Sequence, residues 1–458
     1  MAYKSKYTGA EIENKMDVVF KSHLEEREVE ITENGITEIV PSEGYLGLSK
    51  VAVNVGINKG KWTGHADAEG LRAIGWTDED IAYYQENGVN WNAEDDELHK
   101  VSEDNKALYG VLTANNISTY KDRIVYLPKI DTSAKTSMSS MFSNCYSLVA
   151  LPMLDTSNVT KMYATFYNCY SLVCAPQLNT KMVTDMEQMF YNCHSLIYLP
   201  ELNIESVTTL RYAFYQCFSL EYIYMSELNN VSNLEYSFGY CLVLKAIPLI
   251  DTNKVTNMNG AFMSCYSLVS IPELNTTSVQ SMVNTFNMCI SLIAIPLIDT
   301  SNVTRMSSCF KDCRSLVYVP PLNMKMVTDT SQMFYNCYSL VSVSQLNTMN
   351  VTNMSNMFQY CYSLTSVHEL DAHKVTSSSN AFISCTSLVI ANLKNINLAY
   401  SFANSSLLSK ESLLYIINNE AATSAITIKL ASYVYTRLAE DADIVAALAN
   451  HPNITLAK

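Results

Sequence analysis

The sequence predicts an α/β solenoid, a long array of short coils of chain stacked on one another. Phenylalanine recurs with a 24-residue period and without a slip, from Phe142 through Phe166 and Phe190 to Phe382. Each phenylalanine is followed three residues later by a cysteine and six residues later by a leucine, from Cys145 to Leu388. A fixed period of this length is typical of repeat arrays, in which each unit contacts its neighbours. Such arrays favour recognition over catalysis, because they present extended surfaces to partners.

One repeat unit, LVALPMLDTSNVTKMYATFYNC at residues 148–169, illustrates the expected coil. Its first half is extended and ends near Pro152, because proline cannot donate to a strand ladder. Turn-forming and helix-capping residues follow at 155–158. The next apolar residues have spacings of 3, 4 and 3, which predicts one face of a short helix: Val159, Met162, Phe166 and Cys169. Each coil should therefore run strand, corner, short helix, corner.

Stacking turns each repeated position into a column. Strands about 4.8 Å apart should form a parallel sheet, and the leucine, methionine, phenylalanine and cysteine columns should form one core. An Asp/Asn column, which includes Asp155 and Asn179, is expected to hydrogen-bond the corner backbone. It is less suited to cations, because amides interrupt the carboxylates. The cysteine ladder predicts small buried side chains rather than disulfides, which parallel Cβ vectors do not favour, or a metal stack.

The array is expected to span residues 116–408. The period weakens at both ends, where Ser118 replaces the phenylalanine and Phe402 comes four residues early, with Ser405 in the cysteine slot. Residues 409–458 are predicted to form a cap of one helix, a strand and two further helices. A solenoid needs such a cap, because its open end would otherwise fray or pair with another copy.

The segments before the array divide into three parts. Residues 1–25 predict an amphipathic helix. Residues 26–60 predict a small β module, with a hairpin at an Asn-Gly turn. Residues 61–115 predict an acidic helical segment, in which Thr77 caps a helix that buries Tyr84.

The composition excludes several kinds of partner. The net charge of −14 argues against nucleic acid and anionic membrane, and no run approaches the roughly 18 apolar residues of a membrane span. The first residues lack an uninterrupted apolar core and a small-residue cleavage site, so we expect no signal peptide and synthesis in a cytoplasm. No nucleophile motif, zinc spacing or phosphate loop is visible. The chain is therefore expected to be non-enzymatic, with no cofactor and no metal.

Binding residues are expected where outward-facing positions break the column pattern. The third strand position varies between small residues and tyrosine, and its tyrosines are the first candidates: Tyr198, Tyr222 and Tyr318. The position after the ladder cysteine is rich in aromatic residues and supplies further candidates: Tyr146, Tyr170, Tyr266, Tyr338 and Tyr362. Exposed tyrosines suit contacts with proteins or sugars. The alternative is that they stack on one another and only seal the edges of the array.

The repeats, in copies such as MFSNCYSLVALPMLDTSNVTKM and MFYNCYSLVSVSQLNTMNVTNM, resemble the BspA-like leucine-rich repeats of bacterial and phage surface proteins over about residues 118–408. The resemblance implies a right-handed leucine-rich-repeat array used in adhesion or protein binding. The stretches YTGAEIENKMDVVF and GWTDEDIAYYQENGVNWN resemble segments of virion proteins from bacteriophages of Bacteroides-type gut hosts. There they mount variable modules on the particle.

Two functions follow from these resemblances. The first is a bacteriophage virion structural protein of a tail, baseplate or head appendage, which binds other virion proteins or a host surface protein or glycan. The alternative is a bacterial BspA-like surface adhesin, which would need a secretion leader. A glycan-degrading tail enzyme is a third and less favoured interpretation. A homo-oligomer is expected, because the small β module has open edges and appendages follow particle symmetry.

Overall fold

The structure is a computed structural model in which the described residues are 28–33, 36–41, 68–86, 101–225, 229–247, 252–344 and 346–458. The chain divides into two compact units, Met1–Trp62 and Thr63–Lys458. The helix expected within residues 1–25 lies outside the described residues.

The first unit contains the hairpin that the sequence predicts. Strand β1 (Glu28–Glu33) pairs antiparallel with β2 (Ile36–Pro41), and Glu33 lies opposite Ile36. Only an Asn-Gly pair separates the two strands in the sequence, which is the shortest and commonest hairpin connection. The hairpin is therefore confirmed, and the rest of the β module lies outside the described residues.

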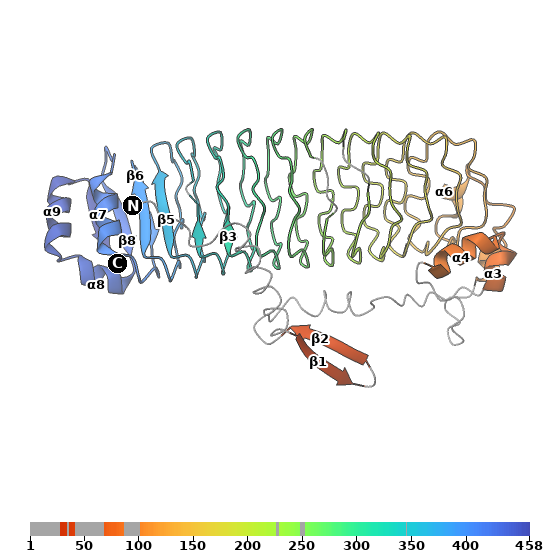
Figure 1. Cartoon of the computed structure of the whole chain (residues 1–458), viewed down its shortest axis with the longest axis horizontal. Coiled ribbons are helices and arrows are strands. Elements are labelled where there is room, and N and C mark those ends of the chain that lie inside the picture. Colours follow the sequence, from red (N-terminus) through yellow and green to blue (C-terminus); the bar gives the residue numbers. More distant parts are fainter. Residues whose placement is uncertain are drawn as a thin grey trace. The chain divides into compact units, whose positions relative to one another are not determined.

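The second unit contains the predicted solenoid of leucine-rich repeats. We number its coils so that coil 1 is residues 124–147, coil 2 is residues 148–171, and the later coils follow with the same period. Figure 1 shows the coils stacked in a single row. Two lines of parallel pairing join neighbouring coils at a 24-residue offset, as in Cys174↔Tyr198 on the strand segments and Ser137↔Lys161 on a second side.

The strand pairing is longest toward the carboxy-terminal end of the array. Four parallel strands form a sheet there in the order β3-β4-β5-β6. Their bounds are Tyr318–Val319 for β3, Ser342–Val343 for β4, Ser366–Asp371 for β5 and Ile390–Lys394 for β6.

The short helix predicted for each coil is wrong. After Val159 the chain makes consecutive turns instead, in which Ala164 and Asn168 have positive φ angles of 50° and 59°. Alternate N–H groups donate to carbonyls of the next coil. For example, the Phe166 N–H donates to the Met189 carbonyl oxygen at 2.8 Å. A helix would use these donors within its own coil, whereas the turns use them to join coils. The spacing of 3, 4 and 3 still buries the four apolar side chains.

Phenylalanine rings stack through the interior of the array. From Phe142 to Phe402, the centroids of neighbouring rings are 5.1–5.8 Å apart and the ring planes differ by 2–18°. Each such pair contributes about 0.5–1.5 kcal/mol beyond the burial of its apolar area. The column is continuous, so every coil between the first and the last gains two ring contacts that it could not form alone.

The ladder cysteines are buried and free, as predicted, and they also form hydrogen bonds. The Cys169 thiol donates to the Phe142 carbonyl of the preceding coil at 3.1 Å, and the same contact recurs in each coil up to Cys385. Burial raises the pKa of Cys169 well above its ordinary value, which keeps the thiol protonated. Ser405, in the cysteine slot of the last coil, donates to the Phe382 carbonyl at 2.8 Å.

The Asp/Asn column hydrogen-bonds the corner backbone, as predicted. Asp155 Oδ1 accepts from the Ser157 N–H at 3.0 Å, and the same contact recurs along the array as far as Asp371. The threonine that follows is buried, and Thr156 Oγ1 donates to the Asn179 carbonyl of the next coil at 3.1 Å. The corners therefore brace each coil and link it to the next one.

The amino-terminal end of the array is closed by a buried asparagine. Helices α5 (Glu103–Lys106) and α6 (Ile117–Tyr120) precede coil 1. Asn105 Nδ2 donates to the Tyr126 carbonyl at 2.7 Å, and its Oδ1 accepts from the Val125 N–H at 3.0 Å. The side chain thus takes the place of a neighbouring strand at the open edge of coil 1.

The cap contains the helix, strand and two helices that the sequence predicts, and a final strand that it does not. Strand β7 (Tyr400–Phe402) belongs to the last coil, and the parallel order β7-β8-β9 continues the stacking into the cap. Figure 1 shows the three helices gathered at this end. The bounds are Lys410–Asn418 for α7, Ile426–Leu430 for β8, Ser432–Leu438 for α8, Ala442–Asn450 for α9 and Ile454–Ala457 for β9.

Substitution of a ring in the middle of the column tests the role of the phenylalanine stack. Phe262→Ala leaves a cavity and removes two ring contacts, so we expect it to destabilise the array by about 3–5 kcal/mol. Tyr318→Ala, at an exposed ring, should change the stability by less than about 0.5 kcal/mol. Thermal and denaturant unfolding of the two variants measure the difference, and similar midpoints would contradict the role assigned to the stack.

Candidate binding surface

Helices α3 (Ala68–Ala73) and α4 (Asp78–Glu86) lie near the first coils (Figure 1), and α4 contacts the strand segments there. The Tyr84 side chain is fully buried, and its hydroxyl donates to the Leu151 carbonyl at 2.5 Å. We call this side of the array the strand face and define it by the third-position residues, which are Ala150, Cys174, Tyr198, Tyr222, Ala246, Ser270, Ala294, Tyr318, Ser342 and Ser366.

A buried carboxylate anchors α4 to the array. Asp80 is 1% exposed, its Oδ1 accepts from the Met153 N–H at 2.8 Å, and Lys129 Nζ lies 3.2 Å from its Oδ2. The predicted cap, Thr77, donates to Asp80 through both its N–H and its hydroxyl. Burial acts to raise the pKa of Asp80, but the bonds from Thr77 and Met153 and the charge of Lys129 outweigh it and hold the pKa below its ordinary value. The charged carboxylate therefore ties the start of α4 to coils 1 and 2.

This packing corrects the expectation that every third-position side chain projects into solvent. Ala150 and Cys174 are buried, and Tyr84 lies beside Cys174. The face is open farther along, where Tyr222 and Tyr318 are 42% and 46% exposed. The sequence could not show this difference, because α4 lies far from the repeats along the chain.

Of the three tyrosines predicted first, Tyr222 and Tyr318 lie on the open part of the strand face, whereas Tyr198 lies near Tyr83 of α4. Tyr198 is half-buried, and burial together with the nearby Tyr224 and Cys174 raises its pKa. Tyr222 lies in the adjacent coil, with Lys245 Nζ 5.3 Å from its ring centroid. The structure therefore gathers Tyr198, Tyr222 and Tyr224 over coils 4 and 5. Tyr318 lies apart in coil 9.

The tyrosines after the ladder cysteines form a separate column. The rings of Tyr146 and Tyr170 stack at 5.2 Å, and those of Tyr338 and Tyr362 lie 5.2 Å apart at a tilt. Tyr266 is half-buried. Such stacking agrees with the alternative that these tyrosines only seal the edges of the array. A role for them in binding stays a prediction.

An aromatic cluster that the sequence did not predict lies on the side of the array formed by the consecutive turns. Tyr191 stacks on Tyr215 and Tyr212 stacks on Tyr236, each at 5.1 Å, and burial raises the pKa of Tyr215 to about 12. The second column ends at Gly260, whose φ is +59° and where a Cβ would lie 2.3 Å from the Tyr236 ring. The 24-residue spacing of these tyrosines was the signal that could have revealed the cluster.

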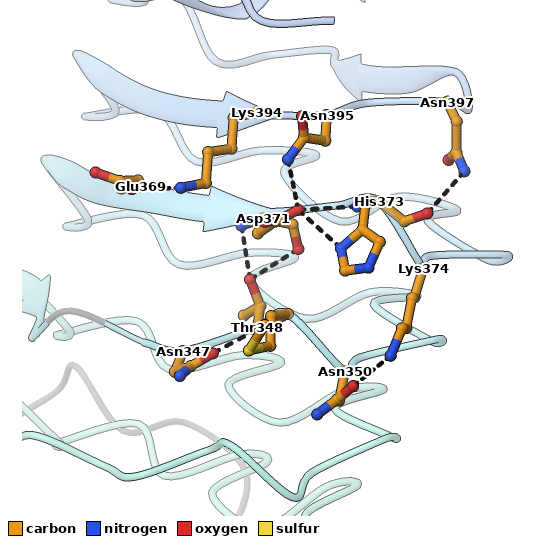
Figure 2. Close-up of polar contacts among 11 residues, drawn as sticks. Asn347, Thr348, Asn350, Glu369, Asp371, His373, Lys374, Lys394, Asn395 and Asn397 are labelled. Carbon is orange, nitrogen blue, oxygen red and sulfur yellow. Dashed lines mark hydrogen bonds and ion pairs between the residues drawn. The ribbon is translucent and has the colours of Figure 1, made fainter. Parts of the chain in front are cut away.

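A polar corner at coils 10 to 12 contains an aspartate and a histidine (Figure 2). Asp371 Oδ1 accepts from the His373 N–H and lies 3.1 Å from His373 Nδ1, and Asn395 Nδ2 donates to it at 3.0 Å. Burial acts to raise the pKa of Asp371, but the bonds from Asn395 and His373 lower it below its ordinary value. The arrangement repeats the Asp155–Ser157 corner of coil 2, so this pair braces a turn rather than forming a catalytic dyad.

The described residues offer no grouping of three or more His, Cys, Asp or Glu side chains that could hold a metal ion. No helix in the same part of the chain is long and apolar enough to cross a membrane.

A family model described as "Mycoplasma protein of unknown function, DUF285" matches residues 115–227, 232–338 and 318–411. These segments cover more than half of the chain. The chain belongs to this family. No curated protein matches the sequence significantly.

Three solved structures are similar to the DUF285 array at low identity. A leucine-rich cell surface protein from Faecalibacterium prausnitzii is 20% identical, with 56% of this chain and 75% of that chain covered and a TM-score of 0.34. A leucine-rich repeat protein from Bacteroides ovatus is 20% identical, with 74% and 92% covered and a TM-score of 0.38. One from Eubacterium ventriosum is 18% identical, with 69% and 84% covered and a TM-score of 0.37.

The DUF285 match begins at residue 115 and ends at residue 411. Helices α3 and α4 and most of the cap therefore lie outside the family model. The DUF285 repeats supply the array and its strand face, whereas the preceding helices decide which part of that face is covered.

Release of α4 should expose Cys174. Asp80→Ala removes the acceptor of the Met153 N–H and the partner of Lys129, so α4 should detach more often, and alkylation of Cys174 should become about tenfold faster. Asp78→Ala is the matched control, because its carboxylate is exposed and pairs with exposed Arg72. Peptide mass spectrometry after brief iodoacetamide treatment gives both rates, and an unchanged rate at Cys174 would contradict the anchor.

A methyl group at Gly260 should disturb the turn-side cluster. Gly260→Ala combines a positive φ with a clash against the Tyr236 ring, whereas Gly110→Ala meets a positive φ of 80° but no atom within 4 Å. The first variant should therefore lose about 1–3 kcal/mol more stability than the second. If denaturant unfolding shows that both variants lose the same free energy of unfolding, the Tyr236 ring moves aside for the added methyl group at no cost, which would contradict this prediction.

Proposed function

We propose that this DUF285 protein is a non-catalytic attachment protein whose array binds a protein or glycan through the strand face. One observation carries the proposal: the face that holds α4 in the first coils continues uncovered and presents large apolar side chains. On the strand face itself these are Tyr222 and Tyr318, and further large apolar side chains are exposed at other positions of the same strand segments and the turns that follow them: Tyr224, Leu297, Val317 and Val341. A gathering of exposed apolar side chains on one face marks an interaction site in many proteins.

The rigidity of the array supports this use of the face. Each coil is hydrogen-bonded to both neighbours, so the side chains on the strand face keep a fixed spacing. A pre-organised surface loses less conformational freedom when it binds, which raises affinity for a given contact area. The exposed aromatic rings can supply the contacts that usually dominate such interfaces.

Two settings are compatible with an attachment protein. A bacterial surface comes first, because the family description names a cellular bacterium and no reported match is described as a virion protein. A bacteriophage tail, baseplate or head appendage comes second and rests on the resemblance of the amino-terminal stretches. In either setting, residues 1–60 would mount the array and could assemble copies through the edges of the β1–β2 hairpin, which is two-stranded in the described residues.

Loss of strand-face tyrosines should weaken attachment. Beads coated with the full chain are incubated with cells that live alongside the source organism, and the beads retained on the cells are counted. The double variant Tyr222→Ala/Tyr318→Ala should retain about tenfold fewer beads, because exposed aromatic anchors dominate such interfaces. The matched control is Tyr163→Ala/Tyr433→Ala, which removes two exposed tyrosines that are not on the strand face. An equal loss in the control, or no loss in the first variant, would contradict the assignment of the face.

The setting is decided by where the native chain is found. An antibody against the chain should label the surface of intact source cells if the chain is a bacterial adhesin. Labelling of purified phage particles instead would support the virion setting. Recovery only from the soluble interior of the cells would contradict both.

A further inference from the structure

We infer that the chain binds a neutral oligosaccharide in a hollow at the corners of coils 2 to 4, an inference that rests on the attachment function proposed above. The hollow has a volume of about 560 Å³, which lies within the range of roughly 300–1,000 Å³ that is typical of small-molecule sites. It lies beside the anchor of α4, and none of the tyrosines predicted from the sequence lines it.

The walls of the hollow offer hydrogen-bonding groups from three successive coils. Asp155 comes from coil 2, Gln177 and Asn179 come from coil 3, and Glu201 comes from coil 4. Contacts among the described residues use only part of this capacity. Asp155 and Asn179 each accept a corner N–H at Oδ1, and Gln177 donates Nε2 to the Glu201 carbonyl at 3.3 Å. The second oxygen of Asp155, the amide nitrogen of Asn179 and the amide oxygen of Gln177 can therefore meet a ligand.

A buried hydroxyl lies beneath the surface of the hollow. Thr180 lines the hollow and is 1% exposed, and among the described residues its Oγ1 has no hydrogen-bond partner. The equivalent hydroxyls of Thr156 and Thr276 donate to carbonyls of the next coil at 3.1 and 2.7 Å. A buried hydroxyl without a partner is unfavourable, so Thr180 stabilises its corner less than Thr156 and Thr276 stabilise theirs.

The chemistry of these groups matches sugar hydroxyls. A hydroxyl both donates and accepts, carboxylates accept, and side-chain amides do both. Met153 adds an apolar surface for the face of a sugar ring. Asp155 and Glu201 outnumber the single cation, Lys181, so the hollow carries a net negative charge, as the whole chain does. This charge disfavours phosphorylated sugars and uronic acids.

Helix α4 holds one wall of the hollow in place. The Met153 N–H donates to Asp80 at 2.8 Å, and Lys129 Nζ donates to the Met153 carbonyl at 3.4 Å. Both contacts come from groups that anchor α4. The wall is therefore formed before a ligand arrives, which favours tight binding of a small ligand.

Binding is tested with the full chain on an array of neutral and acidic oligosaccharides, followed by calorimetry with the best neutral ligand. Binding to neutral oligosaccharides is expected. Glu201→Ala and Gln177→Ala should each weaken it about tenfold, because they remove polar contacts to the ligand. Glu273→Ala is the matched control, since it changes an exposed glutamate at the equivalent position of coil 7 and should leave the affinity unchanged.

A pair of threonine variants checks that binding does not simply follow stability. Thr180→Val keeps the shape of the side chain and removes a buried hydroxyl without a partner, so it should change neither oligosaccharide binding nor the unfolding temperature. Thr276→Val removes the bond to the Asp299 carbonyl and should lower the unfolding temperature without affecting binding.

Two results would overturn the inference: no binding of any neutral oligosaccharide, or full affinity in the Glu201→Ala variant. Binding only to acidic oligosaccharides would also overturn it. Attachment that still depends on Tyr222 and Tyr318 would then leave the proposed function intact, because those residues lie on the strand face and do not line the hollow.

Discussion

Each coil of this protein depends on its neighbours for its backbone hydrogen bonds. The turns of one coil direct alternate N–H groups to carbonyls of the next coil, as Phe166 does toward Met189. Because buried N–H groups need partners, the array can form only with its coils held in one register. The strict 24-residue period follows from that requirement. A slip by one residue would break the ring column, the bonds from the cysteine thiols and the corner contacts of Thr156 and its equivalents together.

This constraint divides the chain into positions that build the array and positions that are free to recognise a partner. Phenylalanine, cysteine and leucine at the repeated positions face inward, and they are poor candidates for binding. The ends are closed by groups that imitate a further coil: Asn105 at the start and the β8–β9 pairing at the finish. The positions that remain variable lie on the strand face and at the corners. Helix α4 covers the strand face of the first coils and leaves that of the later coils open.

The sequence predicted the interior better than the surface. The ladder from Phe142 to Phe382, the corner bonds of Asp155 and the Thr77 cap could all be predicted, because each depends on residues close in sequence or one period apart. The prediction of a short helix was wrong because the spacing of apolar residues does not distinguish a helix from consecutive turns. The turns, with positive φ at Ala164 and Asn168, bury side chains at the same spacing as a helix would. The cover over Cys174 and the hollow at Thr180 could not be predicted, since both arise from packing between distant segments or successive corners.

Oxidative footprinting of the surface tyrosines, with and without the cells to which the chain attaches, tests the central claim most directly. The account predicts that attachment protects Tyr222, Tyr224 and Tyr318 on the strand side of the array. Tyr163 and Tyr433 are also exposed, but they are not on the strand face, and their oxidation should not change. Protection of Tyr163 or Tyr433 with no change at Tyr222, Tyr224 and Tyr318 would contradict the claim that the strand face binds the partner.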